Sequence, residues 1–178
     1  MIVFKDKNSG AEMFTDASKY TLVDDVVYEV EGKIVTVKDD MSSVNIGANE
    51  SQEEASESLE EGMKRGVNVV IYSRLEELVD FAKFTVEQYM KYMKGFMKTL
   101  DLPEDAEEKA ALQKKISGYL NRTLGKKWKN LEKFDQFYGE GASSDPDKLP
   151  MVVLLNYREE DDTPYLVYFK HGLIEEKV

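Results

Sequence analysis

A change of hydrophobic period in the middle of the chain constrains the fold more than any other feature of this sequence. From about residue 84, apolar side chains recur every three or four residues, the spacing of one helix face. One helix is predicted up to residue 100, and Pro103, Glu104 and Asp105 separate it from a second. The apolar stripes are Tyr89, Met93, Phe96 or Met97 and Leu100 in the first, and Leu112, Ile116, Leu120 and Leu124 in the second, with Trp128 left open as a further member. The two helices are predicted to pack as an antiparallel hairpin.

Short β-prone segments lie on both sides of these helices. They span residues 2–4, 26–30, 33–37, 67–72, 151–157 and 165–169. Glu31-Gly32 predicts a hairpin between the second and third segments, and the polar residues 158–164 predict another between the last two. Because strands precede and follow the helices without alternating with them, we predict an α+β fold with mostly antiparallel pairing. The length of 178 residues predicts one domain over 1–178.

Charge is distributed unevenly along the chain. Residues 39–66 contain eight acidic and two basic side chains, a local net charge of −6, with few large apolar residues. Such a segment buries too little apolar surface to offset the entropy of ordering it, so a flexible acidic loop is predicted over 39–66. Residues 84–133 carry eleven Lys or Arg against seven acids, a net charge of +4. The helical hairpin is therefore predicted to be a basic arm on an acidic protein.

Reactive side chains are too few for most catalytic or cofactor sites. The chain has no cysteine and a single histidine, His171, and it lacks the GxGxxG and GxxxxGK[ST] motifs. Disulfides and Cys-containing zinc sites are excluded, and a phosphate cradle is not expected. His171 is interpreted as a polar turn residue rather than as the base of a Ser-His-Asp triad. We predict a protein that acts by binding and not as an enzyme.

Other features bear on where the chain acts. No run of about 18 apolar residues occurs, and Lys5 and Asp6 stand where a signal peptide would have its apolar stretch. A cytosolic protein is therefore expected. The net charge of −11 and the pI near 4.7 oppose attraction of the whole surface to nucleic acid or anionic membrane.

Oxygen ligands suited to calcium are concentrated in the acidic loop. Calcium binds several hard oxygens and accepts flexible loops, although the EF-hand spacing is absent. The candidate ligands are Asp39, Asp40, Asn49, Glu53 and Glu54. We expect weak binding, on the order of 10⁻⁴ M or weaker, because the loop has to be ordered against repulsion among its own acids. The acids at 159–162 are a second candidate cluster, and for both clusters a solvated acidic turn is the alternative.

The basic arm is suited to an acidic partner. Its candidate binding residues are Lys91, Lys94, Lys98, Lys114, Lys115, Lys126 and Lys127. An acidic protein surface, such as the tails of tubulin, is favoured through steering and many weak contacts. Nucleic acid is the competing partner, with Tyr92, Tyr119 and Trp128 to stack bases, but aromatic residues at helical spacing more often belong to a core. A solvated helix face without a partner is the remaining alternative.

Seven short motifs of the chain occur in the order in which one known family carries them. They are Glu12-Met13-Phe14, Val30-Glu31-Gly32-Lys33, Ile46-Gly47-Ala48-Asn49, Phe137-Tyr138-Gly139-Glu140, Tyr157-Arg158-Glu159, Thr163-Pro164-Tyr165 and Gly172-Leu173-Ile174-Glu175-Glu176-Lys177. Together they show that the chain resembles the translationally controlled tumour protein (TCTP) family along essentially its whole length.

The resemblance implies a small β-tent, similar to that of a Rab-directed exchange factor, with a protruding helical hairpin and a mobile acidic loop. It implies a non-enzymatic cytoplasmic protein that binds calcium weakly, associates with tubulin or microtubules, and takes part in growth and cell-survival regulation. Residues 91–133 fall in the helical segment that the family links to tubulin. Export without a signal peptide is also compatible with the resemblance.

The same resemblance adds an alternative partner and two exclusions. Glu12 matches the family's GTPase-facing glutamate, which implies modulation of guanine nucleotide exchange on a Rheb-like small GTPase. The zinc site of the Rab-directed factor is excluded because the chain has no cysteine. Many animal members end in cysteine, whereas this chain ends in Val178, so we expect a monomer without a disulfide-linked dimer. No specific nucleic acid and no membrane partner are expected.

Overall fold

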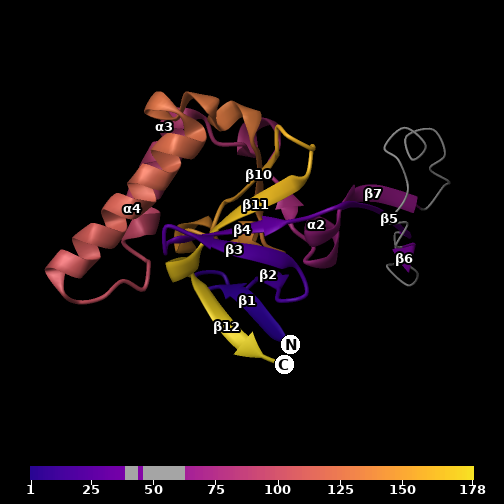
Figure 1. The fold of residues 1–178 in the computed structure, drawn as a ribbon, viewed down its shortest axis with the longest axis horizontal. Coiled ribbons are helices and arrows are strands. Elements are labelled where there is room, and N and C mark those ends of the chain that lie inside the picture. Colours follow the sequence, from indigo (N-terminus) through magenta and orange to yellow (C-terminus); the bar gives the residue numbers. More distant parts are fainter. Residues whose placement is uncertain (39–43, 46–62) are drawn as a thin grey trace.

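The computed structural model describes residues 1–38, 44–45 and 63–178, and within these ranges the strands form three antiparallel sheets (Figure 1). The first has the order β12-β1-β2, with β1 at Ile2–Asp6, β2 at Glu12–Thr15 and β12 at Leu173–Lys177. The second has the order β3-β4-β11-β10-β9-β8, formed by Lys19–Val23, Val27–Glu31, Pro164–Phe169, Val153–Tyr157, Asp135–Tyr138 and Glu76–Glu77. The third has the order β6-β5-β7, formed by Val44–Asn45, Ile34–Lys38 and Met63–Val67. Together with the helices, these sheets make the predicted α+β fold.

Helices join the sheets and form the predicted hairpin. The α-helices are α2 at Asn68–Tyr72, α3 at Val86–Met97 and α4 at Ala106–Leu124. The 3₁₀ helices are η1 at Asp80–Ala82, η2 at Lys126–Lys133, η3 at Ala142–Ser144, η4 at Pro146–Lys148 and η5 at Lys170–Gly172. In Figure 1 the α3–α4 hairpin lies at one end of the molecule and the β6-β5-β7 sheet at the other, while the two chain termini lie together.

Local signals account for the ends of the two long helices. Thr85 caps α3 with a capping box. Its hydroxyl accepts from the backbone N–H of Gln88 at 3.3 Å, and the Gln88 side-chain oxygen accepts from the backbone N–H of Thr85 at 2.9 Å. The Asp105 carboxylate accepts from the Glu108 amide at 3.1 Å and caps α4. Trp128, left open as a last member of the second stripe, lies beyond the end of α4. Gly125, at φ +81°, ends α4 after Leu124, and Trp128 belongs to η2.

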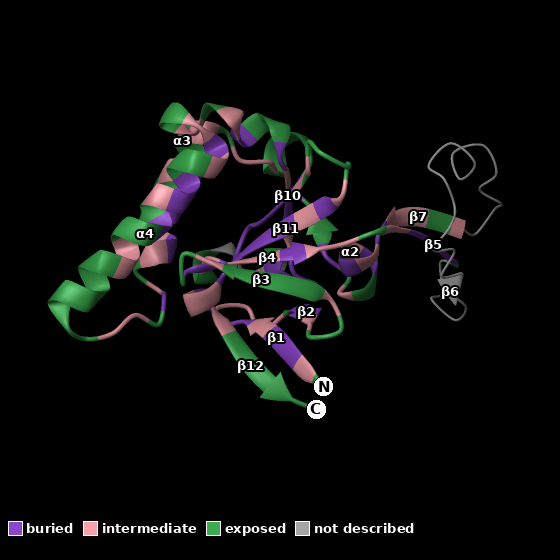
Figure 2. Ribbon diagram, viewed as in Figure 1, coloured by how far each residue is buried: buried purple, intermediate pink, exposed green. Residues whose placement is uncertain are grey.

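The predicted apolar stripes are confirmed as the inner faces of the hairpin. The core shared with the sheets buries the predicted residues Tyr89, Met93, Phe96, Leu100, Ile116, Leu120 and Leu124, and Met97 and Leu112 are partly buried against it. Tyr92 and Tyr119, which were not assigned to the stripes, are buried there as well. Figure 2 shows buried positions on the side of α4 that faces the sheet and exposed positions at the tip of the hairpin. Residues 104–111 are all exposed, so the start of α4 extends beyond the core.

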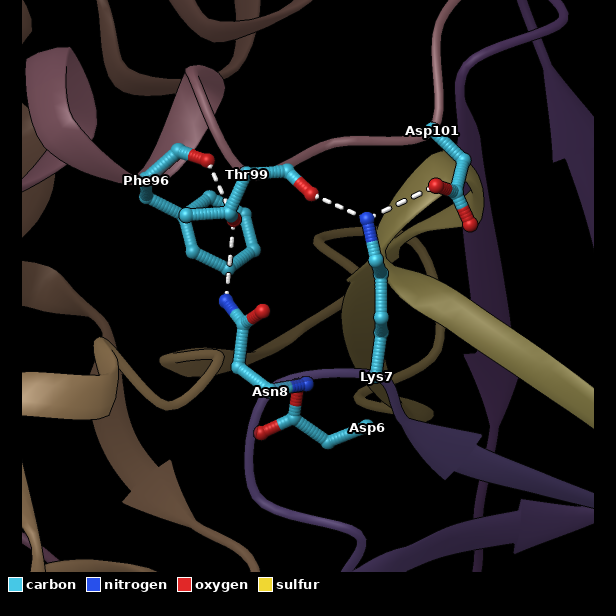
Figure 3. A network of polar contacts seen from close by, with 6 residues as sticks. All are labelled: Asp6, Lys7, Asn8, Phe96, Thr99 and Asp101. Carbon is cyan, nitrogen blue, oxygen red and sulfur yellow. Dashed lines mark hydrogen bonds and ion pairs between the residues drawn. The ribbon is translucent and has the colours of Figure 1, made fainter.

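A polar network holds the end of α3 against the turn between β1 and β2 (Figure 3). The Lys7 ammonium donates to the Thr99 carbonyl at 2.6 Å and to Asp101 Oδ1 at 2.7 Å. The Asn8 amide donates to Thr99 Oγ1 at 2.9 Å, and that hydroxyl donates to the Phe96 carbonyl at 2.7 Å. The last carbonyls of the helix thereby gain partners that the helix itself cannot supply. This network fixes how α3 sits on the sheets.

Of the two predicted β-hairpins, one is confirmed and one is wrong. β10 and β11 pair as expected. β4 and β5 do not pair, because β4 lies between β3 and β11, whereas β5 lies between β6 and β7. At Gly32 the chain crosses from one sheet to the next, and a Cβ there would lie 2.7 Å from Val67 Cγ1 and 2.9 Å from Asn68 Oδ1. Glycine is therefore needed for close approach at a crossing, not for a tight hairpin turn.

Two further predictions change at the third sheet. Residues 67–72, predicted as a strand, divide into the end of β7 and the helix α2, which buries Val69 and Ile71. A short apolar run does not distinguish a strand from a buried helical turn, which explains the error. Residues 44–45 and 63–66, predicted within the flexible acidic loop, form β6 and most of β7 beside β5. The rest of the predicted loop lies outside the described residues.

Candidate functional site

One side of α3 carries three exposed lysines, Lys91, Lys94 and Lys98, which we call the α3 lysine surface. Their spacing of three and four residues places them on the same side of the helix, away from the buried residues Tyr92 and Phe96. Within residues 1–38, 44–45 and 63–178, no carboxylate forms an ion pair with any of the three. Their charges therefore face solvent.

The basic side of α4 is arranged differently. Lys114 and Lys115 are both exposed, but the Lys115 ammonium lies 3.2 Å from Asp25 Oδ2. Two turns further along, the Arg122 guanidinium forms an ion pair with Asp24. Both aspartates belong to the turn between β3 and β4, so this side of α4 is partly neutralised by the sheet. The predicted basic arm is thus not uniformly available to a partner.

A partly buried polar cluster attaches α4 to β4. The Tyr119 hydroxyl donates to Glu29 Oε2 at 2.6 Å, and the Arg158 guanidinium donates to Glu29 Oε1 at 2.8 Å. Arg158 also stacks over the ring of Tyr165, 3.9 Å from its centroid. Burial, together with the bond to Glu29, raises the pKa of Tyr119. Burial disfavours the charged form of Arg158, but the hydrogen bond and charge of Glu29 outweigh it and raise the pKa of Arg158.

The remaining residues predicted for the arm lie after α4. Lys126 and Lys127 are exposed in η2, where Lys127 has a left-handed backbone. The three aromatic residues considered for base stacking are held by protein contacts. Tyr92 and Tyr119 are buried, and the half-buried Trp128 donates from Nε1 to Asn121 Oδ1 at 2.9 Å. This arrangement favours the core interpretation of these side chains over base stacking.

Glu12 is exposed at the start of β2, opposite Lys5 of β1. It lines a cavity of about 490 Å³ together with Tyr72, Arg74 and Glu140. The Arg74 guanidinium lies 3.6 Å from Glu140, so the cavity contains an ion pair beside the Glu12 carboxylate. Glu12 therefore lies in a polar recess accessible to a partner, on the sheets and not on the hairpin.

Of the two clusters predicted to bind calcium, the structure describes the one at 159–162. Asp39, Asp40, Asn49, Glu53 and Glu54 lie outside the described residues. The acids at 159–162 are described and exposed, and Asp161 Oδ1 accepts from the Thr163 amide at 3.1 Å. Hydrogen bonds from Thr163 lower the pKa of Asp161. Among the described residues no group of three or more acidic or histidine side chains is arranged to hold a metal ion.

His171 is half-buried in η5, as its interpretation as a turn residue predicts. Its carbonyl accepts from the Asp101 amide at 2.9 Å, next to the Lys7 network. Burial, assisted by the charge of Lys170, lowers the pKa of His171. Its Nδ1 is buried without a hydrogen-bond partner among the described residues. The side chain therefore favours the neutral form.

Helices of the described ranges include none that is both long and apolar enough to cross a membrane. The fold and the surfaces together define an α+β protein of antiparallel sheets with a helical hairpin, and one side of α3 presents lysines without an ion-pair partner in the part of the chain that the structure describes. The sequence model described as "Translationally controlled tumour protein" matches residues 1–174. The chain belongs to the TCTP family.

Relatives and solved structures of the family match the whole chain. A translationally-controlled tumor protein homolog of Schizosaccharomyces pombe is 41% identical over 180 residues, covering 99% of each chain. A homolog of Branchiostoma belcheri is also 41% identical, over 183 residues, again covering 99% of each. The structure of the translationally controlled tumor-associated protein p23fyp from S. pombe has a TM-score of 0.71 at 38% identity and covers 100% of both chains. The TCTP structure from Caenorhabditis elegans has a TM-score of 0.70 at 27% identity, covering 100% of this chain and 99% of that one.

Proposed function

We propose that this chain is a non-catalytic binding protein whose α3 lysine surface docks acidic protein segments, first among them the acidic tails of tubulin on microtubules. The observation that carries the proposal is the exposure of Lys91, Lys94 and Lys98 on one side of α3, without a described carboxylate in ion-pair contact. The TCTP family is not known as an enzyme family, which supports the proposal of a non-catalytic binding protein.

Electrostatics supports docking at this one surface. Exposed charges are screened beyond about 8 Å at physiological salt, so a partner responds to local lysines and not to the net charge alone. Single exposed ion pairs contribute about 0–1 kcal/mol, so several lysines have to act together. The net charge of −11 repels an acidic partner from the rest of the molecule and orients it toward α3. The proposed interaction is weak, multivalent and salt-sensitive.

Charge reversal on α3 tests this proposal. Lys91→Glu with Lys94→Glu and Lys98→Glu is expected to abolish co-sedimentation with microtubules while leaving the circular dichroism spectrum unchanged. The matched control reverses three exposed lysines of the sheets, Lys33→Glu, Lys38→Glu and Lys177→Glu, and alters the net charge equally. Co-sedimentation that survives the α3 reversals, or that is lost equally in the control, rejects docking at α3.

A second candidate function is modulation of nucleotide exchange on a Rheb-like small GTPase through Glu12. The observation that favours it is the exposed position of Glu12 in a recess with the Arg74–Glu140 pair, which offers both signs of charge to a partner. Its test is nucleotide release from the GTPase, which Glu12→Ala should slow while the α3 reversals do not. Absence of any acceleration by the wild-type protein eliminates this function.

Calcium binding and the cellular role remain proposals that accompany family membership. Weak calcium binding by Asp39, Asp40, Asn49, Glu53 and Glu54 is checked by titration followed through amide shifts in NMR spectra. Shifts confined to 39–66 support the site, and unchanged spectra contradict it. For the role in the cell, we propose a monomeric cytoplasmic protein that takes part in growth and cell-survival regulation. Export without a signal peptide is compatible with this role.

A further inference from the structure

Phe81 is fully exposed, with a relative accessibility of 103%, and Val79 beside it is 52% exposed. The backbone on both sides is fixed by Gln136, which is itself buried. The Leu78 amide donates to the Gln136 carbonyl at 2.7 Å. At the other end, the Gln136 side chain accepts from the Phe84 amide at 2.8 Å and donates to the Phe84 carbonyl at 3.0 Å. The segment that carries Phe81 is therefore anchored at both ends while its aromatic side chain faces solvent.

The segment between these anchors has a defined shape. Asp80 has a left-handed backbone, at φ +53°, and begins the single turn of η1. In this turn the Ala82 amide donates to the Val79 carbonyl at 3.0 Å. A non-glycine residue in this conformation persists only where its surroundings hold it. The outward position of Phe81 is thus built into the loop.

A groove opens beside Phe81, and we call it the Phe81 groove. It has a volume of about 460 Å³ and is lined mainly by aromatic and aliphatic side chains. The lining residues that matter here are Phe84, Gln88, Lys91, Tyr92, Tyr138 and Leu149. This volume lies within the range of about 300–1,000 Å³ typical of sites for small ligands, and it is sufficient for one large side chain with its neighbours.

The wall of the groove is pre-formed. Tyr92 is buried, and its hydroxyl donates to the Pro150 carbonyl at 2.5 Å and accepts from the Val152 amide at 3.0 Å. Phe84 packs on Tyr92 with ring centroids 5.3 Å apart. Binding to such a rigid wall loses little conformational entropy.

Charge identifies the kind of partner. Lys91 is the charged residue that lines the groove, and none of the described lining residues is acidic. Lys94 continues the positive charge one helical turn further along α3. Because a lysine stands at the edge of this apolar groove and no acid lines it, the groove is complementary to a segment that carries carboxylates beside an apolar side chain, and not to one that carries cations there.

We propose that the Phe81 groove binds a short acidic peptide segment of a partner protein, whose apolar or aromatic anchor side chain enters the groove beside Phe81 while its carboxylates meet Lys91. This binding site goes beyond the microtubule proposal. It shares Lys91 with the α3 lysine surface, but its apolar anchor at Phe81 lies outside that surface and is tested separately. A buried aromatic anchor at the centre of such a contact carries most of the binding energy.

Fluorescence anisotropy with synthetic peptides tests the site. The probe is a fluorescein-labelled peptide of eight glutamates around a central tryptophan, compared with the same peptide carrying a central alanine. The wild-type chain should bind the tryptophan peptide about tenfold or more tightly than the alanine peptide, and Phe81→Ala should remove this difference. Folding should be unaffected, because Phe81 is fully exposed.

The control removes an exposed apolar side chain elsewhere, Ile174→Ala, and should leave the preference intact. Equal affinity for the two peptides, or a preference that persists in Phe81→Ala, overturns the proposal. Sedimentation velocity of the chain alone distinguishes another occupant. A self-association that Phe81→Ala abolishes shows that a second copy covers the groove, and this also overturns the proposal.

Discussion

The two helices of the hairpin are both rich in lysine, yet only one of them uses its own cations to attach to the sheets. α3 packs on β11 through Phe96, whose ring lies 5.7 Å from that of Phe169, and the Lys7 network holds its C-terminal end. The lysines of α3 have no described carboxylate partner. α4 adds polar contacts to its apolar stripe, since Tyr119 and Arg122 bind acidic residues of the β3–β4 region. A helix anchored by apolar groups leaves its cations to solvent, whereas one anchored by polar groups uses some of them in the fold.

This difference shows why net charge along a segment is an incomplete guide to a binding surface. Residues 84–133 carry a net charge of +4, but Lys115 and Arg122 already contact Asp25 and Asp24. Among the described residues α3 is therefore the helix of the hairpin whose lysines all lack an ion-pair partner, whereas α4 has some of its cations paired. Five predictions test this contrast, beginning with the largest effect.

Removing the aromatic anchor of α3 is expected to have the largest effect on stability. Phe96 is completely buried, and its ring lies 5.3 Å from Tyr92 and 5.7 Å from Phe169. Phe96→Ala should lower the free energy of unfolding by about 3–5 kcal/mol, measured by urea denaturation. Phe81→Ala, the same substitution at an exposed site, should change it by less than about 0.5 kcal/mol. Similar losses at both positions would contradict apolar anchoring of α3.

Removing the polar anchor of α4 is expected to have the next largest effect. Glu29→Ala leaves the buried Tyr119 hydroxyl and the Arg158 guanidinium without their shared acceptor. A loss of about 2–3 kcal/mol in the free energy of unfolding is expected. Asp25→Ala breaks only the exposed pair with Lys115 and should cost about 0–1 kcal/mol. If the two variants are equally stable, Glu29 does not anchor α4.

Removal of one tyrosine hydroxyl from each helix, that of Tyr119 in α4 and that of Tyr89 in α3, compares how much each hydroxyl stabilises the fold. Tyr119→Phe loses the bond to Glu29 and should destabilise the fold by about 1 kcal/mol. The buried Tyr89 hydroxyl has no hydrogen-bond partner among the described residues, so Tyr89→Phe should be neutral or slightly stabilising. Thermal denaturation of both variants checks this order, and the reverse order would show that the hydroxyl contacts are wrongly assigned.

The same tyrosines predict the response to alkaline pH. Burial raises the pKa of Tyr89, Tyr92, Tyr119 and Tyr168 above the value in the unfolded chain. Above about pH 10 the unfolded chain loses these protons while the folded chain retains them, so stability is full below that pH and declines above it. Tyr89→Phe should reduce the steepness of the decline in urea titrations at successive pH values. An identical pH profile for this variant would contradict the burial argument.

Releasing the paired cations of α4 should have the smallest effect. Asp24→Asn with Asp25→Asn frees Arg122 and Lys115 from their partners in the β3–β4 turn. Affinity for microtubules should rise, at most about fivefold, because exposed ion pairs of this kind contribute about 0–1 kcal/mol. Co-sedimentation over a range of tubulin concentrations measures the change. A decrease in affinity would show that the turn itself contacts the partner.

The helices were predictable from the sequence because a long periodic stripe is a strong local signal. Phe96 and Leu120 occupy the positions that the pattern assigns to the core, and both are buried. β3 and β12 lack such a signal, since their side chains are mostly exposed and do not alternate. Pairing with β4 and β1 makes them strands, and that information lies elsewhere in the chain.

The sequence predicted which lysines belong to the candidate site, but not which of them are paired with acids in the fold. Sequence identified the lysines of α3 and α4 alike. It could not show that Asp25 meets Lys115, because 90 residues separate them and only the packed fold brings them together. The Phe81 groove was not predicted either, since it depends on how Gln136 fixes the chain on both sides of η1.

Chemical-shift mapping with an acidic tail peptide of tubulin tests the central claim most directly. Amide resonances of the ¹⁵N-labelled chain, followed as the peptide is added at low salt, report which helix the acidic segment contacts. Docking at the α3 lysine surface predicts saturable shifts centred on residues 91–98. It also predicts smaller changes near Lys115 and Arg122, and loss of all shifts at high salt. Shifts centred on α4, or none on α3, would contradict it.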